Sequence, residues 1–200
     1  MYRLPDKVVM ASGNLGKLRE IENILSDLDI QVLPQSALGV TEAEETGTTF
    51  VANALLKARH AANTTGLAAI ADDSGLVVAA LDGRPGIYSA RYSGPDASDA
   101  DNIDKLLREL DGVEEHLRDA EFQCAVCLVT PDGAAPLIAT GKWRGRILRE
   151  RRGEGGFGYD PVFFDVECGR SAAELSSDEK NERSHRGKAL RQLAAALRRA

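Results

Sequence analysis

A strand that ends in two adjacent carboxylates is the feature of this sequence that most limits its fold. Residues 66–70 form an apolar run, and residues 71–76 then read Ala-Asp-Asp-Ser-Gly-Leu. We predict that a buried strand stops at Asp72 and Asp73, with Ser74 and Gly75 in a turn, because unpaired carboxylates are costly to bury. Two interpretations remain open: a turn closed by Asp and Ser side chains, or a site for Mg²⁺ and a general base.

The composition fits one globular domain over residues 1–200, in one or two lobes. Of the 200 residues, 43% are hydrophobic and 28% are charged. No apolar run nears the roughly 18 residues that a membrane helix needs, and the first residues lack a signal pattern. We therefore expect a cytoplasmic protein without a membrane partner. The net charge of -6 argues against a surface that coats nucleic acid, so we expect no nucleic-acid partner.

The three cysteines fit a reducing compartment, because they form no disulfide framework. Cys124 and Cys127 have C-x-x-C spacing inside residues 122–129, which are typical of a buried strand. Side chains three positions apart on a strand point to opposite faces. We therefore expect two small core residues, and neither a redox pair nor half of a zinc site.

Strands and helices alternate in the first half of the chain, and a hairpin follows later. This order predicts an α/β or α+β domain built on a mixed sheet with flanking helices. The expected strands are residues 7–11, 30–33, 66–70, 121–130 and 137–143, and the expected helices are residues 15–28, 49–63, 98–110 and 188–197.

The first strand is joined to the first helix by a short turn that reads Ser-Gly-Asn-Leu-Gly-Lys at residues 12–17. Amide donors at a helix start, with Lys17 in the first turn, suit a phosphate group. The spacing is not that of a Walker A loop. An ordinary helix N-cap by Ser12 or Asn14 explains the same residues equally well.

A polar stripe follows an acidic loop at residues 41–47. In the helix after this loop, Asn53, Lys57 and His60 lie on one side, opposite the apolar residues. A solvated helix face explains this stripe, unless it borders the carboxylates of residues 72 and 73.

Two later segments combine glycine, aromatic and charged residues. Residues 153–161 present two aromatic rings, and an aromatic ring can stack on a nucleobase. The following residues rule out a Rossmann fingerprint, because an apolar run and no helix comes next. In residues 176–187, His185 by itself is typical of a surface residue, whereas Arg186 can donate two parallel bonds to a purine edge or a phosphate.

Five motifs together resemble the inosine triphosphate pyrophosphatase family, the non-canonical purine NTP pyrophosphatases. Their order and spacing agree over nearly the whole chain, from Val8 to Leu197. The motifs are Ser12-x-Asn14-x-x-Lys17, Glu44-Glu45-Thr46-Gly47, Ala71-Asp72-Asp73-Ser74-Gly75-Leu76, Gly156-Phe157-Gly158-Tyr159-Asp160-Pro161 and Ser184-His185-Arg186-Gly187.

The resemblance implies a homodimeric α/β enzyme with an active-site cleft between two lobes. Such an enzyme hydrolyses ITP, dITP and XTP to the monophosphate and pyrophosphate with Mg²⁺. By the family's motifs, Glu44 and Asp73 would bind the metal, and Asp73 would be the base. The phosphates would be held by Ser12, Gly13, Asn14, Leu15, Gly16 and Lys17, and the rest of the substrate by Ser74, Phe157, Gly158, Tyr159, Asp160, Lys180, His185 and Arg186.

One position departs from the family pattern. Many members carry an acidic residue where this chain has Ala52, so Glu44 or Glu45 would take more of the metal-binding task. Three alternatives stay open: a pyrophosphatase of broader or modified-pyrimidine range, a module that binds nucleotides without hydrolysis, and an interaction domain whose charged loops are only solvated.

Overall fold

The computed structural model describes residues 5–25 and 30–199, in two compact units. Three strands of the sheet contribute residues to both units: β3 (Ala68–Val78), β4 (Asp119–Val129) and β5 (Leu137–Ile147). Unit 1 comprises Met1–Asp73, Cys124–Gly141 and Arg186–Ala200, and unit 2 comprises Ser74–Gln123 and Lys142–His185.

The predicted mixed sheet with flanking helices is confirmed. β1 pairs in parallel with β2 and β3, whereas β6 pairs antiparallel with β5 and β7. The sheet has seven strands in the order β2-β1-β3-β4-β5-β6-β7. The strands are β1 (Lys7–Met10), β2 (Gln31–Pro34), β3 (Ala68–Val78), β4 (Asp119–Val129), β5 (Leu137–Ile147), β6 (Phe163–Asp165) and β7 (Arg170–Ser171); the α-helices are α1 (Leu15–Leu25), α2 (Phe50–Thr65), α3 (Asp99–Glu109), α4 (Ser177–Arg183) and α5 (His185–Leu197).

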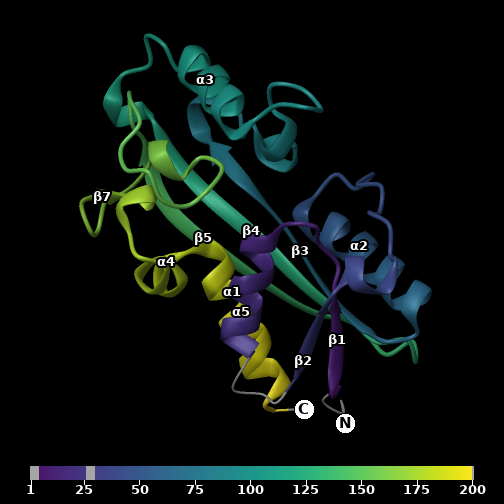
Figure 1. The fold of residues 1–200 in the computed structure, drawn as a ribbon. Coiled ribbons are helices and arrows are strands. Elements are labelled where there is room, and N and C mark those ends of the chain that lie inside the picture. Colours follow the sequence, from purple (N-terminus) through teal and green to yellow (C-terminus); the bar gives the residue numbers. More distant parts are fainter. Residues whose placement is uncertain (1–4, 26–29, 200) are drawn as a thin grey trace. The chain divides into compact units, whose positions relative to one another are not determined.

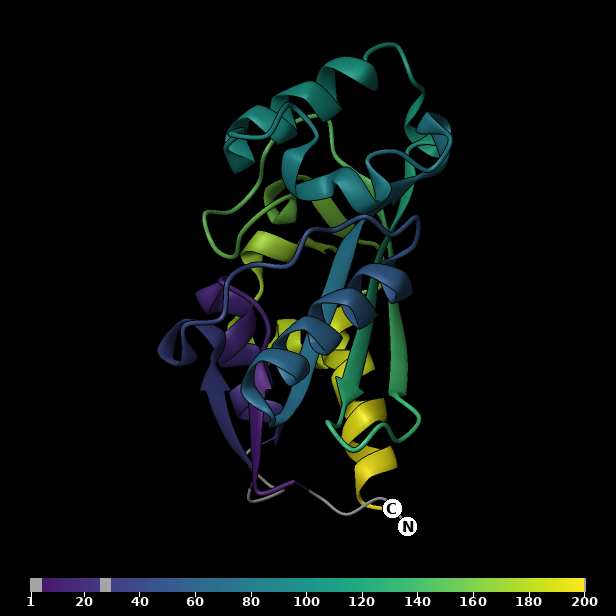
Figure 2. The ribbon, with the colours of Figure 1, turned by 90° about the vertical axis from the view of Figure 1, so that its right-hand side faces the viewer.

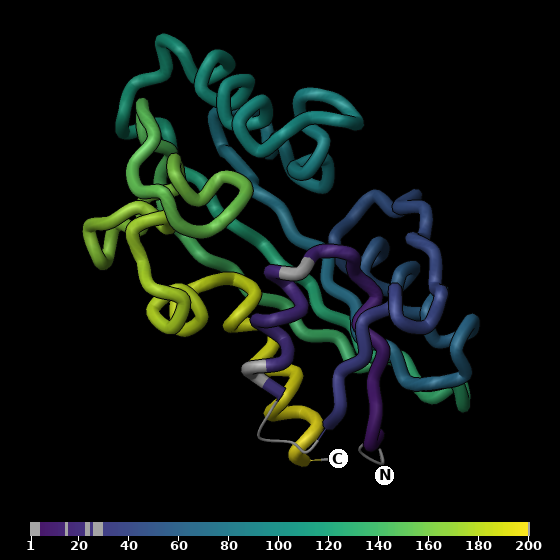
Figure 3. The backbone as a smooth tube through the Cα atoms, viewed as in Figure 1, coloured from purple at the N-terminus to yellow at the C-terminus, as the bar shows by residue number. Residues whose placement is uncertain are grey.

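Unit 1 has three layers, with α1 and α5 on one face of its strands and α2 on the other (Figures 1 and 2). The chain trace shows α1 and α5 side by side, although they come from opposite ends of the sequence (Figure 3). Alternate residues of each strand pack on opposite faces. On β3, Ile70 packs in the core with α1 and α5, and Ala71 packs in the core with α2.

This alternation also confirms the expectation for the two cysteines of β4. Cys124 packs in the core with α1 and α5, whereas Cys127 packs in the core with α2. Both are buried and free, and burial raises the pKa of the Cys127 thiol to about 11. They are core residues, as predicted.

Helix α2 has a clear start, a clear end and one face of small residues. The Thr49 side chain accepts a hydrogen bond from the Ala52 amide at the N-terminus, and Gly66 adopts the left-handed conformation after the last turn, with a φ of 67°. Glycine reaches this conformation without the steric cost of a Cβ atom. The buried face is made of Ala54, Ala58, Ala61 and Ala62.

Unit 2 is built around an aromatic core. The rings of Phe122 and Phe163 lie 4.5 Å apart, and those of Trp143 and Phe163 lie 4.9 Å apart. Helix α3 packs on this core and begins with a capping box, in which Ser98 and Asp101 each bond the other's backbone amide.

Arg118 connects α3 to the end of β5 from inside unit 2. Its side chain donates hydrogen bonds to three carbonyl oxygens, those of Leu110, Ile147 and Leu148, at 2.8 to 2.9 Å. The residue is 2% exposed. Loss of the guanidinium would leave three carbonyl groups without this donor, and such groups are costly when buried.

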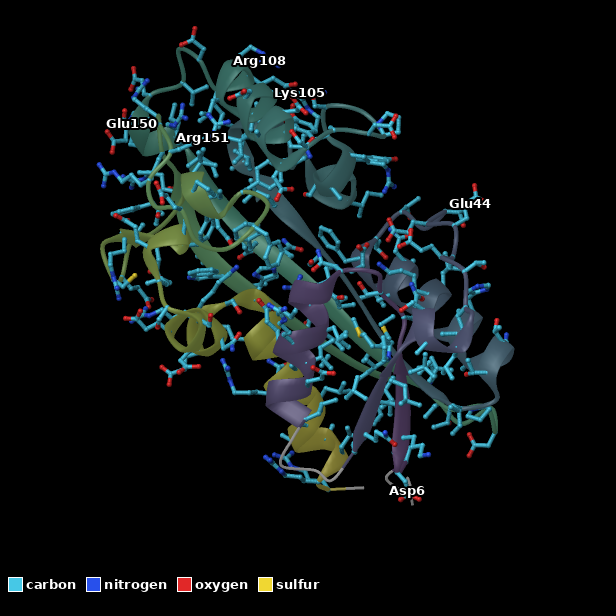
Figure 4. All side chains as sticks on the ribbon, viewed as in Figure 1. Asp6, Glu44, Lys105, Arg108, Glu150 and Arg151 are labelled. Atoms are coloured by element: carbon cyan, nitrogen blue, oxygen red, sulfur yellow. The ribbon has the colours of Figure 1, made fainter. Side chains whose placement is uncertain are left out.

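We expect Arg118→Met to lower the free energy of unfolding by about 3 kcal/mol, because its carbonyl partners would lose their donor. Urea unfolding followed by circular dichroism measures the change. Arg108→Met is the matched control, because Arg108 is an exposed arginine on α3 (Figure 4). Equal losses in the two variants would contradict the anchoring role of Arg118.

Two sequence predictions about element ends need correction or fall outside the described residues. Strand β3 does not stop at the two aspartates but continues to Val78, so no turn forms at Ser74 and Gly75. The predicted helix end near Leu28 lies outside the described residues, within which α1 spans Leu15–Leu25. Among the helices of the described residues, none is long and apolar enough to cross a membrane.

Candidate functional site

The turn before α1 is organised by side chains of the turn itself. Asn14 Oδ1 accepts hydrogen bonds from the amides of Gly16 (2.9 Å) and Lys17 (3.1 Å), and Ser12 Oγ accepts one from the Asn14 amide (3.2 Å). Asn14 therefore caps α1, as one of the two interpretations predicted. The Leu15 side chain lies outside the described residues.

Gly13 lies beside the side chain of Glu42. A Cβ atom on Gly13 would lie 2.8 Å from Glu42 Oε1, which is the far end of an exposed, flexible side chain that can move away. The backbone of the predicted phosphate turn therefore lies beside an acidic side chain of the following loop, whose predicted metal ligand is Glu44.

Asp72 and Asp73 are neighbours on β3, and their side chains therefore point to opposite faces of the sheet. Asp72 is 0% exposed and Asp73 is 6% exposed. Asp72 lies two residues after Ile70 and therefore on the face of β3 that packs with α1 and α5. Asp73 lies two residues after Ala71 and therefore on the face that packs with α2. Each carboxylate thus meets a different set of partners. This explains why the strand passes both without ending.

Asp72 Oδ2 lies 3.1 Å from Lys17 Nζ and 3.1 Å from Arg186 Nε. Lys17 comes from the first turn of α1 and Arg186 from the first turn of α5. Burial disfavours the charged form of Asp72, but attraction to Lys17 and Arg186 outweighs this and holds the pKa of Asp72 well below its usual range. Asp72 is a permanent anion that fixes two cations.

Asp73 meets the polar stripe of α2. Asn53 Nδ2 donates to Asp73 Oδ2 at 3.1 Å, and Lys57 Nζ lies 3.5 Å from Asp73 Oδ1. Lys57 Nζ also lies 2.7 Å from Glu45 Oε1. The stripe therefore borders the carboxylates, and it is not a solvated face at Asn53 and Lys57. Its third member, His60, instead lies 3.0 Å from the Thr41 carbonyl oxygen.

Asp73 and Asp72 have opposite pKa shifts. Burial raises the pKa of Asp73, and repulsion from Glu45 raises it further, whereas Lys57 and the Asn53 bond lower it in part. A carboxylate with a raised pKa accepts a proton more readily, which suits a general base. Burial alone would lower the pKa of Lys57, but attraction to Asp73, Asp72 and Glu45 raises it, so Lys57 remains a cation.

The carboxylates around Lys57 provide the donor set for a divalent cation. Glu45 and Asp73 both lie within 3.5 Å of Lys57 Nζ, so they lie near each other. Mg²⁺ takes one or two carboxylates, with waters and phosphate oxygens as its other ligands, so this pair fits it. Among the described residues no group of three or more His, Cys, Asp and Glu side chains is placed to hold a metal.

Glu44, the predicted metal ligand, is exposed, and its side chain points outward from the loop before α2 (Figure 4). Glu45, its neighbour, is the one that contacts Lys57. The sequence named both residues in one motif but had no means to choose between them, because the loop has no regular repeat that would set the side-chain directions.

In unit 2 the glycine-rich loop at residues 153–161 is held in place by hydrogen bonds. Asp160 Oδ2 accepts from the Phe157 amide at 2.8 Å and from Lys180 Nζ at 2.5 Å, and Lys180 Nζ lies 4.4 Å from the centre of the Phe157 ring. The Gly158 amide donates to Asp99 Oδ2 at 2.6 Å. Phe157, Asp160 and Lys180, predicted from separate motifs, are thus brought together.

The two rings of this loop have different surroundings, which the sequence did not predict. Tyr159 is 4% exposed, belongs to the core of unit 2, and donates its hydroxyl to the Ser89 carbonyl oxygen at 2.8 Å. Its ring is therefore not presented for stacking, whereas the Phe157 ring is half-buried. His185 is buried and stacks on Phe122, with 4.7 Å between ring centres, so it is not a surface residue. Ser74 lies half-buried on β3.

Comparisons with known proteins agree over nearly the full length. A sequence profile of the Ham1 family matches residues 8–196. A dITP/XTP pyrophosphatase of Methylococcus capsulatus is 56% identical over 193 residues, which are 96% of this chain and 96% of that protein. A dITP/XTP pyrophosphatase of Escherichia coli O157:H7 is 55% identical over 193 residues, which are 96% of this chain and 98% of the relative.

Solved structures give the same result. A HAM1 protein from Coxiella burnetii has a TM-score of 0.90 and 50% identity, covering 97% of this chain and 99% of that one. The Ham1 protein of Staphylococcus aureus has a TM-score of 0.87 and 41% identity, covering 96% of this chain and 98% of that one. The profile match, the close relatives and the shared fold lead to one conclusion: the chain belongs to the Ham1 family.

Proposed function

We propose that this protein is a Mg²⁺-dependent nucleoside triphosphate pyrophosphatase that hydrolyses ITP, dITP and XTP to the monophosphate and pyrophosphate. The relatives named dITP/XTP pyrophosphatase support the reaction and the substrate class. The observation that carries the proposal is geometric: the neighbouring carboxylates of Asp72 and Asp73 are both buried, and Asp72 pairs with Lys17 and Arg186, whereas Asp73 meets Asn53 and Lys57 and is suited to act as a base.

In this proposal the phosphates are held by the turn before α1 and by Lys17. The turn at residues 12–17 offers backbone amides, and Lys17 offers a cation whose ammonium is fixed by Asp72. Glu45 or Glu44 holds Mg²⁺ together with Asp73. When bound, the ion neutralises charge on the phosphate oxygens.

The chemical step requires a water molecule aligned with the α-phosphorus, a base for its proton and cations for the leaving pyrophosphate. Asp73 accepts the proton of the attacking water, and the Asn53 amide holds its carboxylate in place. Lys57 and Lys17 stabilise the negative charge that grows on the leaving group. The reaction needs no covalent intermediate.

Phe157, His185 and Arg186 are proposed to contact the nucleoside. The Phe157 ring supplies a stacking surface, which Lys180 and Asp160 keep in place. His185 and Arg186 contact the purine base. A donor facing position 6 can donate a hydrogen bond to the 6-oxo group of hypoxanthine or xanthine. The amino group of adenine is itself a donor, so the protein donor would be left unpaired and adenine would be rejected.

The proposal also covers location and assembly. We propose that the enzyme is cytoplasmic and that it is a homodimer. Each chain forms one domain, which comprises the two units described. Sedimentation velocity at micromolar concentration measures the assembly, and a monomer at all concentrations would contradict the dimer without affecting the proposed reaction.

Product analysis is the direct test of the reaction. With ITP and Mg²⁺ we expect inosine monophosphate and pyrophosphate in equal amounts; inosine diphosphate and phosphate would contradict cleavage at the α-phosphorus. A panel of ITP, XTP, GTP, ATP and dUTP separates the proposed purine selectivity from a broader range. Nucleotide binding without any product would identify a module that binds but does not hydrolyse.

Metal removal is expected to abolish turnover. A chelator should reduce the rate by at least about 100-fold, and added Mg²⁺ should restore it, because charge neutralisation on phosphate oxygens is worth several kcal/mol. Pyrophosphate release with ITP as substrate measures both steps. Unchanged turnover in the chelator would exclude the metal from the mechanism.

A further inference from the structure

Glu20 lies on α1 one helical turn after Lys17. Lys17 contacts Asp72 directly, and Glu20 contacts Arg186, which is a partner of Asp72. Glu20 Oε2 lies 2.6 Å from Arg186 Nη1, and Arg186 Nε lies 3.1 Å from Asp72 Oδ2. The same Asp72 oxygen lies 3.1 Å from Lys17 Nζ. The four side chains form a continuous series of ion pairs inside unit 1, with two positive and two negative charges.

The series is largely shielded from water. The side chains of Asp72 and Arg186 are 0% and 3% exposed, and those of Lys17 and Glu20 are 16% exposed. In such surroundings an uncompensated charge is costly, so each cation depends on its carboxylate. Arg186 depends on two of them, because Glu20 bonds one of its nitrogens and Asp72 another.

Asp72 also has a second oxygen that can bind another donor. Its Oδ1 atom is buried and has no hydrogen-bond partner within the described part of the chain. An arginine released from Glu20 can turn toward this atom, because a guanidinium pairs well with both oxygens of a carboxylate. Asp72 would then hold Lys17 less firmly, and Lys17 would move relative to the turn at residues 12–17.

We propose that Glu20 is a positioning residue, which fixes the guanidinium of Arg186 so that Asp72 keeps Lys17 at the phosphate-binding turn. Glu20 touches neither substrate nor metal in this scheme and acts only through Arg186 and Asp72. The inference rests on the proposed function, because the position of Lys17 matters for turnover only if a triphosphate binds at that turn.

The Glu20→Gln variant tests the proposal, because glutamine keeps the size and one acceptor oxygen but removes the charge. We expect kcat/KM for ITP to fall about 10- to 100-fold, because a small misplacement of a charged group lowers the rate by such a factor. Glu22→Gln is the matched control: Glu22 is an exposed glutamate on the same helix, and its variant should stay within about twofold of the wild type. Equal activity of Glu20→Gln and the wild type would overturn the proposal.

A double-mutant cycle separates positioning from a general effect on folding. If Glu20 acts through Lys17, then Glu20→Gln should change kcat/KM by less than about twofold in a Lys17→Gln background, measured as slow pyrophosphate release at high enzyme concentration. The same loss in both backgrounds would mean that Glu20 does not act through Lys17, and that result would overturn the proposal.

A conservative variant gives a third measurement. Glu20→Asp keeps the negative charge on a shorter side chain, so we expect it to retain more activity than Glu20→Gln, and the reverse order would contradict the role. All variants are compared at temperatures where urea unfolding shows them to be folded. Absence of ITP hydrolysis by the wild-type protein would instead refute the proposed function itself.

Discussion

The Asp73→Asn variant is expected to lose about 10²- to 10⁴-fold in kcat for ITP, the range that a general base contributes. Asparagine matches aspartate in size but cannot accept the proton of the attacking water. Asp73 is the carboxylate whose pKa is raised, mainly by burial, whereas Asp72 is held anionic by two cations. Steady-state pyrophosphate release gives kcat, and calorimetric titration with ITP gives the affinity, which should persist.

Asp82→Asn is the control for this change. Asp82 is exposed in the turn after β3, at a φ of 53°, and asparagine tolerates that left-handed conformation as well as aspartate does. Its kcat should equal that of the wild type. Turnover by Asp73→Asn within about threefold of the wild type would show that another group takes the proton.

The Asp72→Asn variant is expected to lose about 3 to 5 kcal/mol of stability, because removing one partner of a buried ion pair leaves an uncompensated charge. Lys17 and Arg186 both contact the same Asp72 oxygen, so the variant deprives both cations of this carboxylate charge. Urea unfolding measures the loss. The variant should also bind ITP weakly, because the ammonium of Lys17 is no longer fixed.

Removal of a second charge should restore part of this stability. In Asp72→Asn/Lys17→Met the remaining Arg186 and Glu20 balance each other, so the double variant should be more stable than Asp72→Asn but remain inactive. A double variant no more stable than Asp72→Asn would contradict the charge-balance explanation.

The pKa of Asp72 is lowered by folding, so the contribution of Asp72 to the free energy of unfolding is present above pH about 4 and is lost as the pH falls further.

Regular elements made part of the site predictable from the sequence. Asn53 and Lys57 share one face of a helix by spacing alone, and the structure places both on Asp73. In the same way the strand period predicted opposite faces for Cys124 and Cys127, which the structure confirms. The helical repeat of 3.6 residues and the strand repeat of 2 residues depend only on spacing along the chain, so they can be read from the sequence.

The end of β3 shows where local reasoning failed. The sequence predicted a turn at Asp72 and Asp73, because two buried carboxylates need partners. The structure supplies those partners from distant segments: Arg186 lies 114 positions after Asp72 along the chain. The strand can continue through the pair, because the cost of burial is offset by ion pairs that only the folded chain forms.

Irregular loops were the other source of error. Tyr159 and Phe157 are two residues apart in the glycine-rich loop, yet the Tyr159 ring is in the core and the Phe157 ring lies under Lys180. No repeat along the sequence distinguishes these two directions. No repeat sets the side-chain directions of Glu44 and Glu45 either: Glu45 contacts Lys57, and the metal-binding role of Glu44 stays a prediction.

The sequence by itself determined most of the longer elements, the faces of these helices and strands, and the motifs that indicated a phosphate-binding enzyme, but it did not predict β6, β7 or α4. The tertiary structure decided which charges meet: Asp72 faces Lys17 and Arg186, and Asp73 faces Asn53 and Lys57. The physical reason is that element type depends on neighbouring residues along the chain. The pKa of a buried carboxylate depends instead on the charges that packing brings within a few ångströms of it.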